Sequence, residues 1–291
     1  MADDLVARCG VVCAPGIDPA TRQPRPSTDA YLVCGEGRVG WLDSDGERSG
    51  PSDGIGWLVG VVGGDAPGDG RARSAAAALA RIVVRLFQPT PARDPVGVLV
   101  RYLSSAHTRM YWTARSEGES DVGGALALAW LTPAGLAWVE VGTARVLLLR
   151  DGALRRVSKP WPLGDRQRMI VGSRGLGDDT AVHFSADHNV GLLDVRAGDR
   201  LVLGTAGMIE AVEPGTLGAT LRHIDDPQVA AVTCLERARG RGSDAAVAVV
   251  VLDVTRPGAR PLIVEERDDD ESTESTVWTA RVSQGTRRRG S

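Results

Sequence analysis

Residues 58–80 read LVGVVGGDAPGDGRARSAAAALA, an apolar run that breaks into a glycine-rich loop and then into an alanine-rich segment. Loops of this kind usually hold a phosphate group or a metal ion. A mononucleotide loop requires GxxxxGK[ST], but Gly63 and Gly68 are followed by Asp69 and Gly70, so the lysine is missing. The spacing of Gly63 and Gly64 does not match the GxGxxG dinucleotide fingerprint either.

The composition is that of an ordinary globular protein and excludes several function classes. Of the 291 residues, 43% are hydrophobic and 24% are charged, which is enough apolar surface for a large core. A net charge of -3 provides no general basic field for nucleic acid or acidic lipid, so we expect neither as a partner. The acidic start and the lack of a long apolar run argue against a signal peptide or membrane helix and predict a cytoplasmic protein.

Short β-rich segments precede and follow two helical segments. Continuous apolar runs indicate strands buried on both faces, and the Asp151-Gly152 pair indicates a hairpin. The predicted strands are 5–14, two within 30–46, 57–62, 125–131, 136–142, 144–150, 153–158, 199–206 and 245–254. Periodic apolar residues and alanine content predict helices over 70–87, 95–117 and 226–240.

This order predicts an α+β fold, an αββα four-layer sandwich of two mainly antiparallel sheets flanked by helices. We expect a single domain over residues 1–257, because no linker or internal repeat interrupts it. Residues 258–291 hold an acidic block, few apolar residues and a basic end, and predict a polar, disordered C-terminal tail.

Six motifs in order resemble the PPM family, the 2C-type metal-dependent serine/threonine protein phosphatases. GGDAPGD (63–69) resembles the Gly-Gly-His-x-x-Gly-Glu part of its first metal motif, and STDA (27–30) stands where the family has Asn-Glu-Asp-Ala. The others are VEVGTARVLLLRDGALRRVS (139–158), SRGLG (173–177), DRLVLGTAGMIEAV (199–212) and RGSDAAVAVVV (241–251). The resemblance covers residues 5 to 255 and implies the same αββα sandwich, with a dinuclear metal site at one end of the sheets.

The family chemistry needs hard oxygen ligands for two Mg or Mn ions, which activate a bridging water and neutralise phosphate charge. By the resemblance, the bridging aspartate falls on Gly60, and the next residue, a carbonyl ligand, falls on Val61. The Ser-Asp-Gly aspartate falls on Ala206, followed by Gly207. Of the three principal metal carboxylates only Asp244 survives, and it is the one residue expected to bind a metal, weakly.

The remaining positions keep the scaffold rather than the chemistry. Asp29 matches an outer-shell acid of the family, and Glu210 stands where the family has an acid that is not a ligand. Gly63 and Gly64 are retained because the backbone turn needs them. The phosphate-binding arginine of the family falls on Pro24, with Arg25 out of register by one.

The sequence therefore predicts a catalytically inactive or severely impaired 2C-type pseudophosphatase, acting as a binding or regulatory module in bacterial phospho-signalling. No catalytic residue and no cofactor is expected, and the partner would be a protein kinase, a phosphoprotein or another signalling component. One alternative is a weak or atypical phosphatase that uses Mn or Mg, with ligands recruited from Asp65, Asp69 or Glu210. Another is a small-molecule sensor that uses the vacated cleft.

Overall fold

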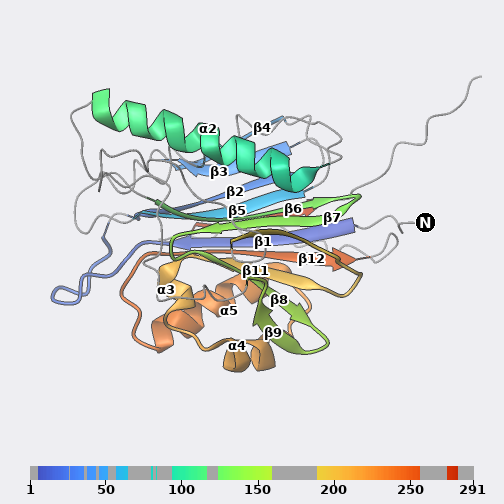
Figure 1. The fold of residues 1–291 in the computed structure, drawn as a ribbon. Coiled ribbons are helices and arrows are strands. Elements are labelled where there is room, and N and C mark those ends of the chain that lie inside the picture. Colours follow the sequence, from blue (N-terminus) through green and yellow to red (C-terminus); the bar gives the residue numbers. More distant parts are fainter. Residues whose placement is uncertain are drawn as a thin grey trace, which may run out of the picture.

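Two antiparallel sheets pack face to face between helical layers, as the order of the elements predicted (Figure 1). The computed structural model describes residues 6–25, 27–35, 38–43, 46–51, 57–64, 80, 83, 94–116, 124–158, 189–255 and 274–280. Helix α2 (Pro95–Ser116) covers the outer face of one sheet. Helices also cover the outer face of the other sheet, so the αββα sandwich is confirmed.

The sheet under α2 has seven strands in the order β10-β7-β6-β5-β2-β3-β4. They are β10 (Val190–Leu193), β7 (Gly135–Val141), β6 (Gly124–Thr132), β5 (Trp57–Gly64), β2 (Asp29–Gly35), β3 (Arg38–Asp43) and β4 (Gly46–Pro51). The sequence did not predict β4 and β10. Both are edge strands: β4 is GERSGP, which has no apolar alternation, and β10 is VGLL, which is too short for periodicity to distinguish a strand from a loop.

The second sheet has six strands in the order β13-β1-β12-β11-β8-β9. They are β13 (Glu274–Ala280), β1 (Val6–Ala14), β12 (Val247–Thr255), β11 (Arg200–Gly204), β8 (Arg145–Arg150) and β9 (Ala153–Arg156). Asp151 and Gly152 join β8 to β9 with φ values of 52° and 78°. Left-handed backbone at both positions is what a two-residue hairpin requires, which confirms the predicted turn.

Helices α3 (Ala206–Ile209), α4 (Pro214–Leu221) and α5 (Pro227–Gly240) lie below the second sheet (Figure 1). The Glu213 and Asp226 carboxylates cap α4 and α5 by accepting hydrogen bonds from free N–H groups of the first turn. Of the helix expected over 70–87, Ala80 and Val83 are helical and buried, and the other positions lie outside the described residues.

Two layers of apolar side chains form the core. One lies between the sheets and under α2, and the other lies between the second sheet and α3, α4 and α5. Val249, Val250 and Val251 are all fully buried because neighbouring residues of β12 point into different layers. This explains why the central strands read as unbroken apolar runs.

The expected disorder of the C-terminal tail is wrong for residues 274–280, which form β13. This strand pairs antiparallel with β1 from Ala7↔Ala280 to Cys13↔Glu274. Its sequence, ESTVWTA, contains threonine, valine and tryptophan, which favour strands when a partner edge is available. The composition of the whole tail hid this short segment, and the remainder of the tail lies outside the described residues.

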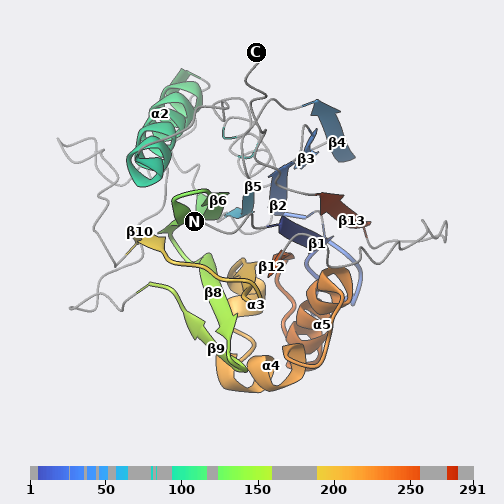
Figure 2. The same ribbon diagram turned by 90° about the vertical axis from the view of Figure 1, so that its right-hand side faces the viewer.

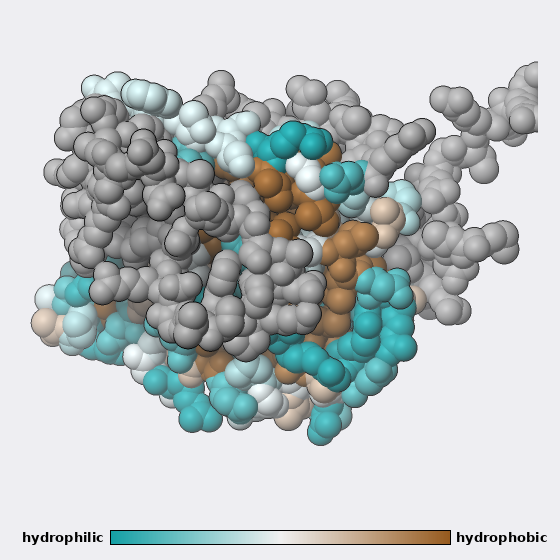
Figure 3. Space-filling model, in the orientation of Figure 1, coloured by the Kyte–Doolittle hydropathy of each residue, from teal (hydrophilic) through white to brown (hydrophobic). Residues whose placement is uncertain are grey.

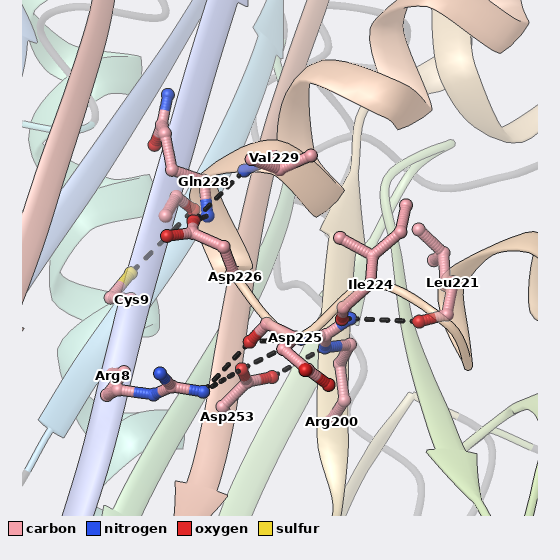
Figure 4. Close-up of polar contacts among 11 residues, drawn as sticks. Arg8, Cys9, Arg200, Leu221, Ile224, Asp225, Asp226, Gln228, Val229 and Asp253 are labelled. Atoms are coloured by element: carbon pink, nitrogen blue, oxygen red, sulfur yellow. Dashed lines mark hydrogen bonds and ion pairs between the residues drawn. The ribbon is translucent and has the colours of Figure 1, made fainter. Parts of the chain in front are cut away.

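A network of charged groups ties the loop between α4 and α5 to the second sheet (Figure 4). Arg200 of β11 forms a bidentate pair with Asp253 of β12, with Nε–Oδ1 and Nη2–Oδ2 distances of 2.5 and 2.9 Å. The Arg200 guanidinium also donates to the carbonyls of Leu221 and Ile224, at 3.0 and 2.5 Å. Arg8 of β1 adds a second cation, 3.3 Å from Asp253 Oδ2. Arg200 and Asp253 are both buried, so each compensates the charge of the other.

The surface between the helical layers is partly apolar on the face shown in Figure 3, where hydrophobic residues lie between α2 and the lower helices. Leu192 of β10 is 52% exposed and Trp112 of α2 is 60% exposed. Among the described residues, no helix is both long enough and apolar enough to cross a membrane.

Candidate functional site

The ends of the two sheets meet where the resemblance places the vestigial site. Asp29 begins β2 and lies opposite Gly63, near the end of β5. A Cβ on Gly63 would lie 3.4 Å from Thr205 Cγ2 and 3.6 Å from Asp29 Oδ1. Thr205 follows β11 and precedes α3, so the site joins the first sheet to the second.

A buried hydrogen bond connects the two sheets at this point. Thr205 Oγ1 donates to Asp29 Oδ2 at 2.5 Å, and the Ala248 N–H donates to the same Oγ1 at 3.0 Å. Thr28 Oγ1 lies 3.2 Å from the other carboxylate oxygen of Asp29. Asp29 is 6% exposed, so this retained acid acts as a structural acceptor rather than as an open metal ligand.

Asp244, which the resemblance makes the one surviving principal metal carboxylate, pairs with an arginine. Its Oδ1 lies 3.0 Å from Arg22 Nη1, and the Asp244 side chain is 35% exposed. Arg22 has a φ of 58°, a left-handed conformation that holds the turn of its loop. The Asp244 carbonyl also accepts from the Ile17 N–H at 2.8 Å, so backbone and side chain both tie the loop to Asp244.

Arg239, in the last turn of α5, holds the chain on either side of Asp244. Its Nη1 donates to the carbonyls of Ser243 and Ala245 at 2.6 and 2.7 Å, and its Nη2 donates to the Pro15 carbonyl at 2.5 Å. Burial lowers the pKa of Arg239, while the nearby charges of Asp244 and Asp29 oppose that change. Sequence reasoning missed both Arg22 and Arg239, since neither stands in a family motif.

Ala206 stands where the resemblance expects an aspartate, and close contacts fix the backbone around it. Ala206 is the first residue of α3 and is half-buried. A Cβ on Gly207 would lie 2.2 Å from the Ala246 carbonyl oxygen, so only glycine allows α3 to approach β12 this closely. Ser243 Oγ donates to the Gly207 carbonyl at 2.8 Å. Glu210 caps the C-terminal end of α3 and is exposed.

The structure does not bring Gly60 and Val61 to this end of the sheets. Gly60 lies within β5, opposite Leu32 and Leu128, and Val61 is a buried position between Tyr31 and Ala127. The strand continues to Gly64, past the point where the resemblance places the metal-binding bend. The apolar sequence of β5 and its two final glycines, Gly63 and Gly64, permit this extension.

These donors do not fit a pair of divalent ions. Asp244 has an arginine partner, Asp29 has hydroxyl partners, and Ala206 has no ligand atom on its side chain. In the part of the chain that the structure describes, no three histidine, cysteine, aspartate or glutamate side chains are grouped to hold a metal. Asp65 and Asp69, the proposed substitute ligands, lie outside the described residues.

Arg25, which is one position out of register with the phosphate-binding arginine of the family, forms an ion pair within its own loop. Its guanidinium lies 3.0 Å from Asp18 Oδ2 within the same loop. The backbone N–H groups of Thr21 and Ala20, followed by Arg25, lower the pKa of Asp18 to about 2. The loop therefore uses this arginine as an internal contact.

A buried glutamate lies at the start of the segment 139–158, which resembles the part of the family built around Gly-Asp-Ser-Arg. Glu140 of β7 is 3% exposed, and its Oε1 accepts from the Val146 N–H at 2.7 Å. Its Oε2 lies 3.8 Å from Arg145 and 3.7 Å from Arg156. Burial raises the pKa of Glu140, and this effect exceeds the opposing hydrogen bond and the two arginines.

A Glu140→Gln variant is expected to gain stability relative to the native chain as the pH rises. The folded-state pKa of Glu140 lies above its ordinary value of 4.5, so folding favours the protonated carboxyl. The stability that this group contributes is present below pH 4.5 and is lost as the pH rises through the folded-state pKa. Urea unfolding of both chains at several pH values measures the difference, and a difference that stays constant with pH would contradict this assignment.

The comparisons agree with this architecture. Searches against protein-family models and curated proteins find no match. Among solved structures, the serine/threonine phosphatase PstP/Ppp of Mycobacterium tuberculosis is 19% identical with a TM-score of 0.63, over 86% of this chain and 100% of that chain. PppA of Pseudomonas aeruginosa is 19% identical with a TM-score of 0.64, over 86% and 100%.

The PPM phosphatase MsPP of Mycobacterium smegmatis, crystallised with cacodylate, is 21% identical with a TM-score of 0.58, over 84% of this chain and 97% of that one. A further structure is a PstP catalytic domain with two manganese ions, 20% identical with a TM-score of 0.64 over 86% and 99%. The chain therefore has the fold of the PPM-type serine/threonine phosphatases.

Proposed function

We propose that this chain is a pseudophosphatase, a PPM-type fold that binds a protein partner without metal-dependent catalysis. The observation that carries the proposal is the pairing of Asp244 with Arg22 at 3.0 Å. A carboxylate that already faces an arginine cannot bind a cation at the same oxygen without losing that partner. Ala206 offers no second carboxylate, and Gly60 lies away from the site.

The retained features support a binding role. Asp29 and Thr205 hold the loops at this end of the sheets through a buried hydrogen bond, Gly207 does so through a close backbone contact, and Arg239 through hydrogen bonds to carbonyls. A surface whose loops are held in place, although the metal ligands are missing, is suited to recognising a protein. The proposed partner is a protein kinase, a phosphoprotein or another component of phospho-signalling in the cytoplasm, with no metal cofactor, nucleic acid or membrane involved.

Metal binding and turnover test the proposal together. We expect no Mn- or Mg-dependent hydrolysis of an aryl phosphate or phosphopeptide, and Mn affinity no better than about millimolar, typical of weakly liganded sites. Calorimetry and steady-state assays on the full chain measure both. Two ordered sites of micromolar affinity, or turnover that depends on Asp244, would overturn the proposal.

Two variants in the loop that contains Arg22 and Arg25 test whether Arg22 competes with a metal ion for Asp244. Arg22→Ala should strengthen Mn binding a few-fold, because it removes the cation beside Asp244. Arg25→Ala removes an arginine that pairs with Asp18 instead, and should leave Mn binding unchanged. Equal effects from the two variants would show that the Arg22–Asp244 pair does not control cation access.

A further inference from the structure

Two arginines in the loop that follows β1 are largely exposed, although each faces a carboxylate. The side chain of Arg22 is 66% exposed beside Asp244, and that of Arg25 is 48% exposed beside Asp18. A guanidinium group has five N–H donors, and Arg22 directs one nitrogen, Nη1, at Asp244. Exposed ion pairs of this kind contribute little to stability, so a further anion can share these arginines or replace their partners.

Hydrogen bonds hold the backbone of this loop in place. The Arg25 N–H donates to the Gly16 carbonyl at 2.7 Å, and the Ile17 N–H donates to the Asp244 carbonyl at 2.8 Å. Arg239 of α5 donates to the Pro15 carbonyl at the start of the loop. Because the backbone is already ordered, a ligand of the two arginines would pay little conformational entropy for ordering the loop.

Strand β13 begins beside this loop. Its first residue, Glu274, pairs with Cys13, whose Sγ lies 3.7 Å from Ser27 Oγ at the other end of the loop. β13, β1 and α5 all lie on the same side of the molecule (Figure 2). β12 ends opposite Val6, at the far end of β1, so the connection over residues 256–273 starts there and finishes beside Arg22 and Arg25.

The sequence that leads into β13 is strongly acidic. Residues 265–274 read EERDDDESTE, with seven carboxylates and one arginine, and 265–273 lie outside the described residues. Residues 268–271 precede Glu274 by three to six positions, so a fully extended chain keeps them within about 10–20 Å of it. A segment on such a short tether meets a neighbouring surface at an effective concentration on the order of millimolar.

We propose that Arg22 and Arg25 form an arginine surface, which the acidic residues 268–271 occupy in cis. The contact consists of charge-assisted hydrogen bonds from guanidinium N–H groups to carboxylates, which are stronger than those between neutral groups. Four adjacent carboxylates also repel one another, and a nearby guanidinium relieves that repulsion. An anionic partner must displace this segment before it reaches the arginine surface. This inference does not rest on the proposed loss of catalysis.

Trypsin reports whether the Arg22 side chain is covered, because the protease must take that side chain into its specificity pocket. Within the loop it can cut after Arg22, whereas Arg25 is followed by Pro26, which blocks cleavage. The full chain carrying Asp268→Asn, Asp269→Asn, Asp270→Asn and Glu271→Gln should be cut after Arg22 at least fivefold faster than the native chain. Mass spectrometry of the early products measures the initial rate.

A matched control removes the same number of negative charges at exposed positions elsewhere. It carries Asp151→Asn, Asp194→Asn, Asp225→Asn and Glu236→Gln. This chain should be cut after Arg22 at the native rate. Equal cleavage rates for the native chain and the variant at 268–271, or equal acceleration in the control, would overturn the proposal.

A peptide in trans tests the chemistry of the surface without protease. The probe is a fluorescent peptide with the sequence of residues 265–273, EERDDDEST, which contains no residue of β13. It should bind the chain neutralised at 268–271 at least tenfold more tightly than the native chain, and more weakly as salt is added. Adding Arg22→Gln and Arg25→Gln to the neutralised chain should abolish binding. Absence of binding, or binding that survives the loss of both arginines, would overturn the proposal.

Discussion

Replacing Gly60 with aspartate, the residue that the resemblance places there, is expected to lower the free energy of unfolding by more than about 4 kcal/mol. A Cβ at this position would lie 2.3 Å from Leu128 Cδ2 and 3.0 Å from the Ala127 carbonyl oxygen. The new carboxylate would also be buried beside the apolar side chains of Leu32 and Leu128. Urea unfolding followed by circular dichroism measures the change.

The matched control is Ala206→Asp, the same new side chain at the other lost carboxylate position. Ala206 is half-buried at the first residue of α3, where a negative charge meets free backbone N–H groups. This variant should change the free energy of unfolding by less than about 1 kcal/mol. A Gly60→Asp chain as stable as the Ala206→Asp chain would show that Gly60 does not lie in the core.

Replacing Asp253 with alanine is expected to reduce the free energy of unfolding by about 3–5 kcal/mol, the usual effect of leaving a buried charge without its partner. Arg200 would lose both bonds of the bidentate pair, and Arg8 would lose its carboxylate (Figure 4). The loop of Ile224 and Asp225 would then be held by a cation without a counterion. Denaturant unfolding of the purified variant provides the measurement.

Two further variants show whether the loss of stability comes from the buried ion pair. The double variant Arg200→Met/Asp253→Leu removes both charges and should recover most of the loss, since well-packed apolar pairs often replace buried ion pairs without penalty. Arg196→Ala breaks an exposed pair with Asp151 and should cost less than about 1 kcal/mol. If Asp253→Ala were no more harmful than Arg196→Ala, the buried network would not support the fold.

The central strands of the two sheets could be predicted because their burial follows from the residue types within each strand. WLVGVV contains no polar residue and AAVAVVVLDV contains a single one, Asp253, so both segments were expected to be buried on both faces. Asp151-Gly152 likewise fixed its hairpin through the backbone freedom of the turn residues. By contrast, β10 and β13 form because an open edge was available to them, and no window of sequence contains that information.

The candidate site was predicted in part. The motif order singled out Asp29, Gly63 and Gly207, and the structure places Asp29 at the start of β2, Gly63 near the end of β5 and Gly207 in α3, just after β11. Gly60 was assigned to the site by its place in a motif, yet the pairing of β5 with β2 and β6 places it in the core. Strand register depends on the neighbouring strands, which a motif does not specify.

The sequence by itself determined the αββα order, the buried strands and the absence of carboxylates at Gly60 and Ala206, since these depend on residue type and spacing alone. Only the tertiary structure decided which side chains contact the remaining acids, Asp29 and Asp244. Arg22 precedes Asp244 by 222 positions and Thr205 follows Asp29 by 176, and folding brings each pair within hydrogen-bonding distance. Contacts across such separations depend on how the sheets pack, so the charge balance of the site is a property of the folded chain.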